Sequence, residues 1–137
     1  MHPHAVYYAH PMASYGGPTE RDDLALLASR FATVVNPNTP TLRAQGRKAA
    51  AAGKPMAPFV RAVERSDAVA WRAFPDGTIG AGVWLEIQTA LRLGKPVYRL
   101  PDMDPHPPHP RFALSIAQTV VANRRWGGGP PLRARKM

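Results

Sequence analysis

A single carboxylate behind a glycine-rich turn is the part of this sequence best suited to chemistry. Glu86 lies near the start of a stretch with helical periodicity, and the preceding turn contains Gly77, Gly80 and Gly82. Glycine lets a backbone approach a ligand closely, and a carboxylate can attack a carbon atom or stabilise a developing positive charge. The pattern therefore predicts a ligand site at which Glu86 is the reactive group.

The elements around Glu86 are expected to place it at one edge of a sheet. Residues 67–74 are short and mostly apolar, as is typical of a parallel strand buried on both faces. Residues 83–93 repeat apolar side chains at helical spacing with Glu86 in the first turn, and residues 97–100 form the next strand. Ligands of open α/β sheets bind beyond the carboxyl ends of the strands, which is where this arrangement puts Glu86.

The rest of the chain continues the same alternation of strands and helices. Strands are expected at residues 5–9 and 33–35, and helices from residue 18 or 19 and over 56–65. Residues 112–122 fit a last helix, or a helix followed by a short fifth strand, and residues 41–54 fit a short helix or a mobile segment. Thr19 and Asp22 resemble a capping box for the first helix. The alternation predicts an α/β fold of the Rossmann/flavodoxin-like type: a three-layer sandwich whose parallel sheet of four to five strands has helices on both faces.

Composition limits the class of protein and its partners. The chain has 137 residues, no cysteine and no apolar run near the roughly 20 residues that a bilayer requires, and its first residues do not resemble a secretory signal. We expect one cytoplasmic α/β domain over residues 1–123, followed by a basic, flexible tail over 124–137. The formal net charge of +9 favours anionic partners. The tail could contact nucleic acid through phosphates, but a solubilising role is favoured because no recognition module accompanies it.

Two other groups of residues invite a ligand hypothesis. Histidines 2, 4, 106 and 109 lie in proline-rich segments without a carboxylate or thiol at ligand spacing, so no metal site is predicted. The loop containing Ser14, Gly16 and Gly17, together with Thr78, could hold a phosphate through hydroxyl groups and backbone N–H groups.

Three ordered segments resemble the nucleoside 2-deoxyribosyltransferase-like superfamily, which includes the 2′-deoxynucleoside 5′-phosphate N-hydrolases. They are the opening YYAHPM at residues 7–12, with glycines and a glutamate following; VVNP at 34–37; and GVWLEIQTA with GKPV at 82–90 and 94–97. The order and spacing of the three segments match over roughly residues 5–100.

The resemblance implies cleavage of an N-glycosidic bond, with Glu86 attacking the anomeric carbon and Tyr7 orienting it through a hydrogen bond. The positions at which many members carry further acids are Phe59 and Gly80 here, so the group that protonates the leaving base must be found elsewhere. Asp76 is the first candidate and His10 the second. The expected catalytic residues are Glu86, Tyr7 and Asp76, and the expected substrate-binding residues are His10, Ser14, Gly16, Gly17, Thr78, Gly80 and Gly82.

The predicted function is hydrolysis of the base–sugar bond of a (deoxy)nucleoside 5′-monophosphate without a cofactor. The alternatives are a nucleoside 2-deoxyribosyltransferase, in which a second base replaces water, and a non-catalytic nucleotide-binding or sensing module. The resemblance also implies a homodimer, because family members commonly assemble with neighbours that complete the site.

Overall fold

A computed structural model describes the backbone of residues 2–127 and the side chains of residues 4–127. Four strands form one sheet in the order β2-β1-β3-β4, and every pair is parallel: β1 (His2–Ala9), β2 (Phe31–Val35), β3 (Ala68–Trp71) and β4 (Val97–Arg99). The predicted α/β fold with a parallel sheet is confirmed. Within residues 2–127 the sheet has four strands, because the segment that could have supplied a fifth is helical.

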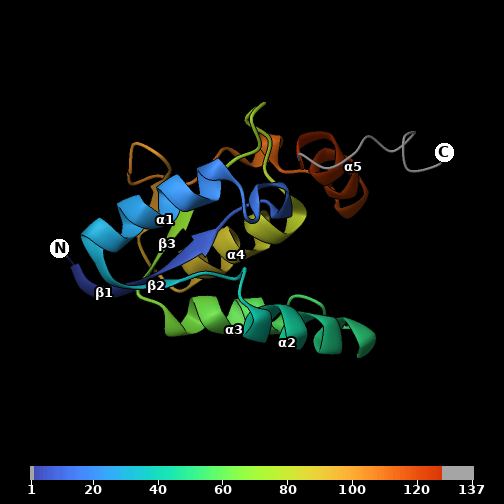
Figure 1. The fold of residues 1–137 in the computed structure, drawn as a ribbon, viewed down its shortest axis with the longest axis horizontal. Helices are drawn as coiled ribbons and strands as arrows, with labels where there is room; N and C mark the ends of the chain where they lie inside the picture. Colours follow the sequence, from blue (N-terminus) through green and yellow to red (C-terminus); the bar gives the residue numbers. More distant parts are fainter. Residues whose placement is uncertain (1, 128–137) are drawn as a thin grey trace.

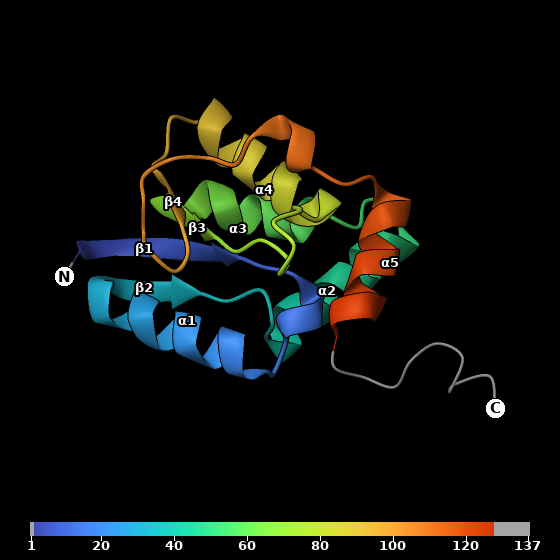
Figure 2. The same cartoon turned by 90° about the horizontal axis from the view of Figure 1, so that it is seen from above.

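Helices cover both faces of the sheet (Figures 1 and 2). The helix α1 (Pro18–Arg30) lies on one face, whereas α3 (Ala57–Arg65) and α4 (Ala81–Arg92) lie on the other. The helix α2 (Pro40–Ala51) packs on α3, and α5 (Ile116–Trp126) lies beyond the carboxyl ends of the strands. Two 3-10 turns, η1 (Met12–Ser14) and η2 (Pro110–Phe112), complete the described chain.

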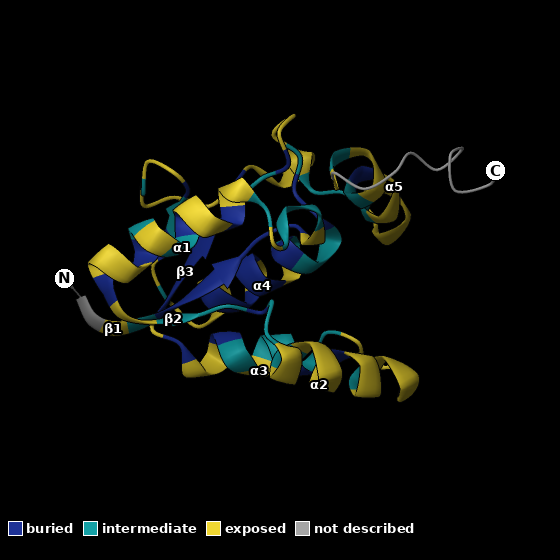
Figure 3. Cartoon of the chain, in the orientation of Figure 1, coloured by how far each residue is buried: buried dark blue, intermediate teal, exposed yellow. Residues whose placement is uncertain are grey.

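Neighbouring tyrosines of β1 point to opposite faces of the sheet. The Tyr7 side chain packs with Val69 and Ile87 on the α4 side, while Tyr8 packs with Leu27 and other residues on the α1 side, and both tyrosines are fully buried. Successive side chains alternate across a strand, so a one-residue step changes the face completely. The sheet is the most buried layer of the molecule (Figure 3). Tyr7 therefore belongs to the same side of the sheet as Glu86.

Several boundaries differ from the sequence predictions. The helix α4 begins at Ala81, two residues earlier than expected, so Glu86 lies in its second turn rather than its first. The segment left open between helix and mobile segment is the helix α2, which Thr39 caps by accepting a hydrogen bond from the Leu42 N–H at 3.2 Å. The expected capping box at Thr19 is wrong, because α1 begins after Gly17 and no side chain caps it.

Two other elements also end at residues that differ from the predicted ones. The strand β3 stops at Trp71, and residues 72–74 leave the sheet as a loop. The helix α5 continues to Trp126, past the boundary expected at residue 123, and residues 128–137 of the predicted flexible tail lie outside the described residues. None of the helices within the described part of the chain is long and apolar enough to cross a membrane.

An ion pair between the buried Asp23 and the partly exposed Arg72 fixes α1 to the loop that follows β3. The Asp23 carboxylate accepts hydrogen bonds from the Tyr8 hydroxyl at 2.6 Å and from Arg72 Nε and Nη2 at 3.0 and 2.5 Å. Asp23 is almost fully buried, whereas Asp22 beside it is exposed. Removing one partner of a buried pair leaves the other charge without compensation, which costs far more than losing a surface pair.

We therefore predict that Asp23→Ala lowers the free energy of unfolding by about 3 kcal/mol or more. The control is Asp22→Ala in the same helix, whose contact with Arg21 at 3.6 Å is exposed and should matter by less than about 1 kcal/mol. Urea unfolding followed by circular dichroism measures both. Equal losses in the two variants would contradict the structural role of the pair.

Candidate functional site

The Glu86 carboxyl is buried between α4 and the sheet, where it accepts a hydrogen bond from a tyrosine hydroxyl. Glu86 is 5% exposed, and the Tyr7 hydroxyl, from the middle of β1, donates a hydrogen bond to its Oε2. The structure thus contains the contact that the family resemblance implies, between residues 79 positions apart in the chain. Oε1 forms no hydrogen bond with any described residue, so one carboxyl oxygen is oriented and the other is available.

Burial controls the charge of this pair. Desolvation raises the pKa of Glu86 to about 8, although the hydrogen bond from Tyr7 opposes the shift. Burial and the neighbouring Glu86 carboxyl raise the pKa of Tyr7 well above its ordinary value. At neutral pH the resting site therefore holds a mostly neutral carboxyl group and a neutral phenol, and a positive charge that develops nearby would favour ionisation of Glu86.

Tyr15 is a third member of this site that the sequence reasoning missed. It is half-buried in the loop after β1, and its ring lies 4.9 Å from that of His10. Burial raises the pKa of Tyr15, the charges on Glu86 and Glu20 raise it further, and Arg43 lowers it. An aromatic residue inside a glycine loop was the available signal, because such a side chain has to be packed somewhere.

Glu20 holds the loop that carries Tyr15. Its carboxylate accepts hydrogen bonds from His10 Nε2 at 2.8 Å, from the Gly16 N–H at 3.0 Å and from Asn38 Nδ2 at 3.0 and 3.2 Å. Burial alone would raise the pKa of Glu20, but these hydrogen bonds lower it overall. One side chain therefore joins the end of β1, the following loop and the connection from β2 to α2.

His10 lies beneath the loop rather than in contact with open space. Its side chain is 0% exposed, stacks on Tyr8 with ring centroids 3.7 Å apart, and directs Nδ1 at the Tyr8 carbonyl oxygen and Nε2 at Glu20. Burial lowers the pKa of His10, although both ring nitrogens face oxygen acceptors. No ring nitrogen remains for a substrate, so in this structure His10 orders Glu20 and does not bind the ligand directly.

Asp76, the first candidate for the general acid, is poorly suited to that role. It is exposed and accepts hydrogen bonds from the Thr78 hydroxyl at 2.6 Å and the Thr78 N–H at 3.1 Å. These hydrogen bonds lower the pKa of Asp76, so the carboxyl is ionised at neutral pH. Thr78 is occupied by the same contact, and the structure does not bring either residue together with Glu86.

The predicted phosphate cradle uses most of its donors internally. The Gly16 N–H bonds to Glu20, and the Gly17 N–H bonds to the Ser14 carbonyl oxygen at 3.0 Å. Gly80 is the N-cap residue of α4, where an added Cβ would lie 3.2 Å from Thr119, and Gly82 packs on Met56 in the first turn. These glycines serve close packing, so the predicted binding role of their amides gains no support from the geometry.

The helix α5 fixes both sides of the site. The Thr119 hydroxyl accepts a hydrogen bond from the Ala81 N–H at 2.8 Å, at the start of the helix that carries Glu86. The Asn123 side chain accepts one from the Ala13 N–H at 2.9 Å, in the loop that carries Tyr15. These two contacts connect the Glu86 helix and the Tyr15 loop through one element.

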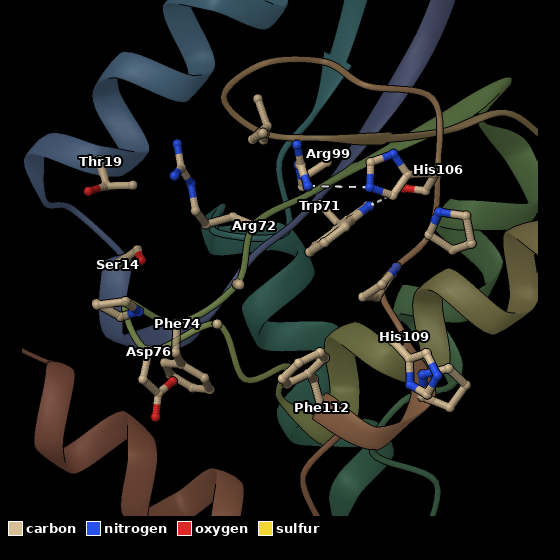
Figure 4. Close-up of a pocket in the computed structure, with 17 residues that line it drawn as sticks. Ser14, Thr19, Trp71, Arg72, Phe74, Asp76, Arg99, His106, His109 and Phe112 are labelled. Atoms are coloured by element: carbon tan, nitrogen blue, oxygen red, sulfur yellow. Dashed lines mark hydrogen bonds between the residues drawn. The ribbon is translucent and has the colours of Figure 1, made fainter.

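A separate cavity of about 1050 Å³ opens where β3 and β4 end (Figure 4). Its lining includes Ser14, Trp71, Arg72 and Asp76, but neither Glu86 nor Tyr7. The predicted site residues are thus divided: Tyr7 and Glu86 meet under α4, while Ser14 and Asp76 lie at this cavity. Within residues 4–127, no three histidine, aspartate or glutamate side chains are grouped so that they could hold a metal ion.

Comparison with known proteins adds no identification. No family model, no curated protein and no solved structure matches this chain.

The raised pKa of Glu86 predicts a pH-dependent stability. A buried carboxyl with a raised pKa contributes fully below about pH 4.5, and this stability is lost as the pH rises through the folded-state pKa of about 8. The Gln side chain of Glu86→Gln does not titrate. We therefore expect its free energy of unfolding to rise relative to that of the wild type by up to about 1 kcal/mol per pH unit across that window. Denaturant unfolding at pH 5, 6, 7 and 8 measures the difference, with the exposed Glu64→Gln as control. A difference independent of pH would show that Glu86 is not desolvated.

Proposed function

We propose that the chain is an N-glycosidase that hydrolyses the base–sugar bond of a (deoxy)nucleoside 5′-monophosphate, with Glu86 as nucleophile. The observation that carries the proposal is the buried Glu86 carboxyl, with one oxygen oriented by Tyr7 and the other free of hydrogen bonds with described residues. Such a carboxyl can stabilise, or form a bond to, a sugar carbon that becomes positively charged as the base departs.

The proposed reaction has two steps. Oε1 of ionised Glu86 forms a bond to C1′ while the bond from C1′ to the base nitrogen breaks, and that nitrogen keeps the electron pair and takes a proton. Water then attacks the glycosyl ester, which releases the sugar phosphate and restores the carboxyl. The Tyr7 hydroxyl remains on Oε2 throughout and keeps the carboxyl in one orientation. Because Asp76 is ionised at neutral pH, water is the better source of the proton for the base.

The substrate phosphate needs a cation near the site. Arg43, which is exposed on α2, lowers the pKa of Tyr15, and Glu86 raises it. We assign the 5′-phosphate to Arg43, since the loop amides expected to hold it are engaged within the protein. The predicted alternative of a deoxyribosyltransferase requires only that a second base replace water in the second step.

A non-catalytic nucleotide-binding module is the second candidate, and two observations favour it. Phe59 occupies a position where many members of the superfamily that the chain resembles carry an acid. It packs against α2, where a Cβ at Gly46 would lie 2.8 Å from its ring. Gly80 occupies the other such position and is closely packed on Thr119. Both positions therefore serve packing and supply no proton. The expected homodimer stays a prediction.

Base release from a panel of (deoxy)nucleoside 5′-monophosphates tests the enzyme. We expect Glu86→Gln to lower kcat/KM by roughly three orders of magnitude, while Glu64→Gln remains active. Because the nucleophile must be ionised, wild-type kcat/KM should rise with pH toward the pKa of about 8. A rate that falls over the same range would assign Glu86 to acid catalysis instead. Nucleotide binding by calorimetry without any base release would favour the second candidate.

A further inference from the structure

The cavity at the ends of β3 and β4 is distinct from the Glu86 site in position and in chemistry. Its lining comes from the start of α1, the loop after β3 and the proline-rich segment that follows β4. Its lining takes Leu100 from the apolar cluster on the α1 side of the sheet and Trp71 from the cluster on the α4 side, but it includes neither Tyr7 nor Glu86. A volume of about 1050 Å³ is sufficient for a small organic ligand.

One corner of this cavity is polar and held rigidly. Ser14, Thr19 and Arg72 lie together on one side in Figure 4. The guanidinium of Arg72 is fixed by Asp23 through Nε and Nη2, while its Nη1 makes no hydrogen bond with residues 4–127. A preorganised donor with one free N–H edge, next to two hydroxyl groups, is suited to an oxyanion.

The opposite wall is aromatic and proline-rich. Phe112 and His109 lie across the cavity from Arg72 in Figure 4, and prolines 107, 108 and 110 line the same wall. The Trp71 indole N–H donates to the His106 carbonyl oxygen at 3.0 Å, which ties this segment to β3. The guanidinium carbon of Arg111 lies over one face of Phe112, 4.8 Å from the ring centroid, and this contact helps to hold the ring in place. Such a wall favours a flat apolar group.

The other charges at the cavity direct an anion to the Arg72 corner. Arg99 is already paired with Asp102 and Asp104 and contacts His106, so each of its three guanidinium nitrogens has a partner. Asp76 is the carboxylate at the lining, and it lies within the field of Arg125 from α5. Arg72 is therefore the cation in the lining that can accept a further partner.

From this arrangement we propose that the cavity is a second ligand site, for a planar aromatic ring that carries one phosphate or carboxylate group. The anionic group binds at Ser14, Thr19 and Arg72, and the ring lies against Phe112 and the prolines. The site is independent of the Glu86 reaction, because no residue of the Tyr7–Glu86 pair lines it.

Amide chemical-shift mapping of the full chain with phenyl phosphate and with benzoate tests the proposal and distinguishes the two anionic groups. We expect shifts at Thr19 and at the non-proline residues of 72–77 and 106–112. Affinity should be at least about tenfold lower for inorganic phosphate or benzyl alcohol, each of which supplies half of the ligand. Absence of saturable shifts, or shifts confined to the surroundings of Tyr7 and Glu86, would overturn the second site. Neither result depends on base release.

A pair of isosteric variants tests the polar corner. Thr19→Val should weaken binding of phenyl phosphate about fivefold, because it removes one hydroxyl without changing the shape of the side chain. Thr41→Val is the matched control, since Thr41 is also the exposed second residue of a helix that begins with proline. Equal effects of the two variants would contradict the assignment.

A second pair tests the aromatic wall. Phe112→Ala should weaken binding about tenfold, and Ile116→Ala, at an exposed apolar side chain outside the cavity, should leave it unchanged. Phe112→Leu, which keeps an apolar side chain but removes the ring, replaces the first variant if its amide spectrum is not native. Full affinity in a folded Phe112 variant would overturn the proposed ring position.

Discussion

The hydrogen bond from Tyr7 to Glu86 is the interaction around which the proposed site is built. It joins the central pair of strands to the helix on one face, and it does so with two groups that burial has deprived of water. A buried carboxyl without a partner would be costly, and one with several partners would have no oxygen left to react. A single donor on one oxygen satisfies both requirements. The orientation of Tyr7 toward Glu86 therefore matters more than the distance from this pair to any other polar group.

Two hydrogen-bond networks, one on each face of the sheet, position the segments around that pair. Glu20 fixes the loop after β1 by hydrogen bonds to three segments, and Tyr15 is carried by that loop. On the other face of the sheet, Tyr8, Asp23 and Arg72 form a network that positions α1 and the loop after β3. The two faces thus use consecutive residues of one strand for different purposes: Tyr7 for the candidate chemistry and Tyr8 for the position of a helix.

Periodicity and turn residues predicted the parallel strands and the helices, because these depend on neighbours in the chain. The contact between Tyr7 and Glu86 joins residues 79 positions apart and was implied only by the family resemblance. The beginning of α4 was missed by two residues, since Ala81 is held by Thr119, which lies 38 positions away. The roles of Tyr15 and Glu20 were missed for a related reason: their partners come from other segments, and spacing in one segment carries no information about them. His10 had the right chemistry for proton transfer, but only the folded chain shows that both ring nitrogens are already engaged.

Two hydrogen bonds connect α5, a helix with exposed apolar side chains, to both sides of the Glu86 site. Thr119 holds the helix of Glu86 and Asn123 holds the loop of Tyr15, so a shift of α5 would displace both sides of the site together. The last helix faces solvent with Ile116 and Val121 and leads into the strongly basic end of the chain. A partner bound to this helix would therefore change the spacing between the Glu86 helix and the Tyr15 loop.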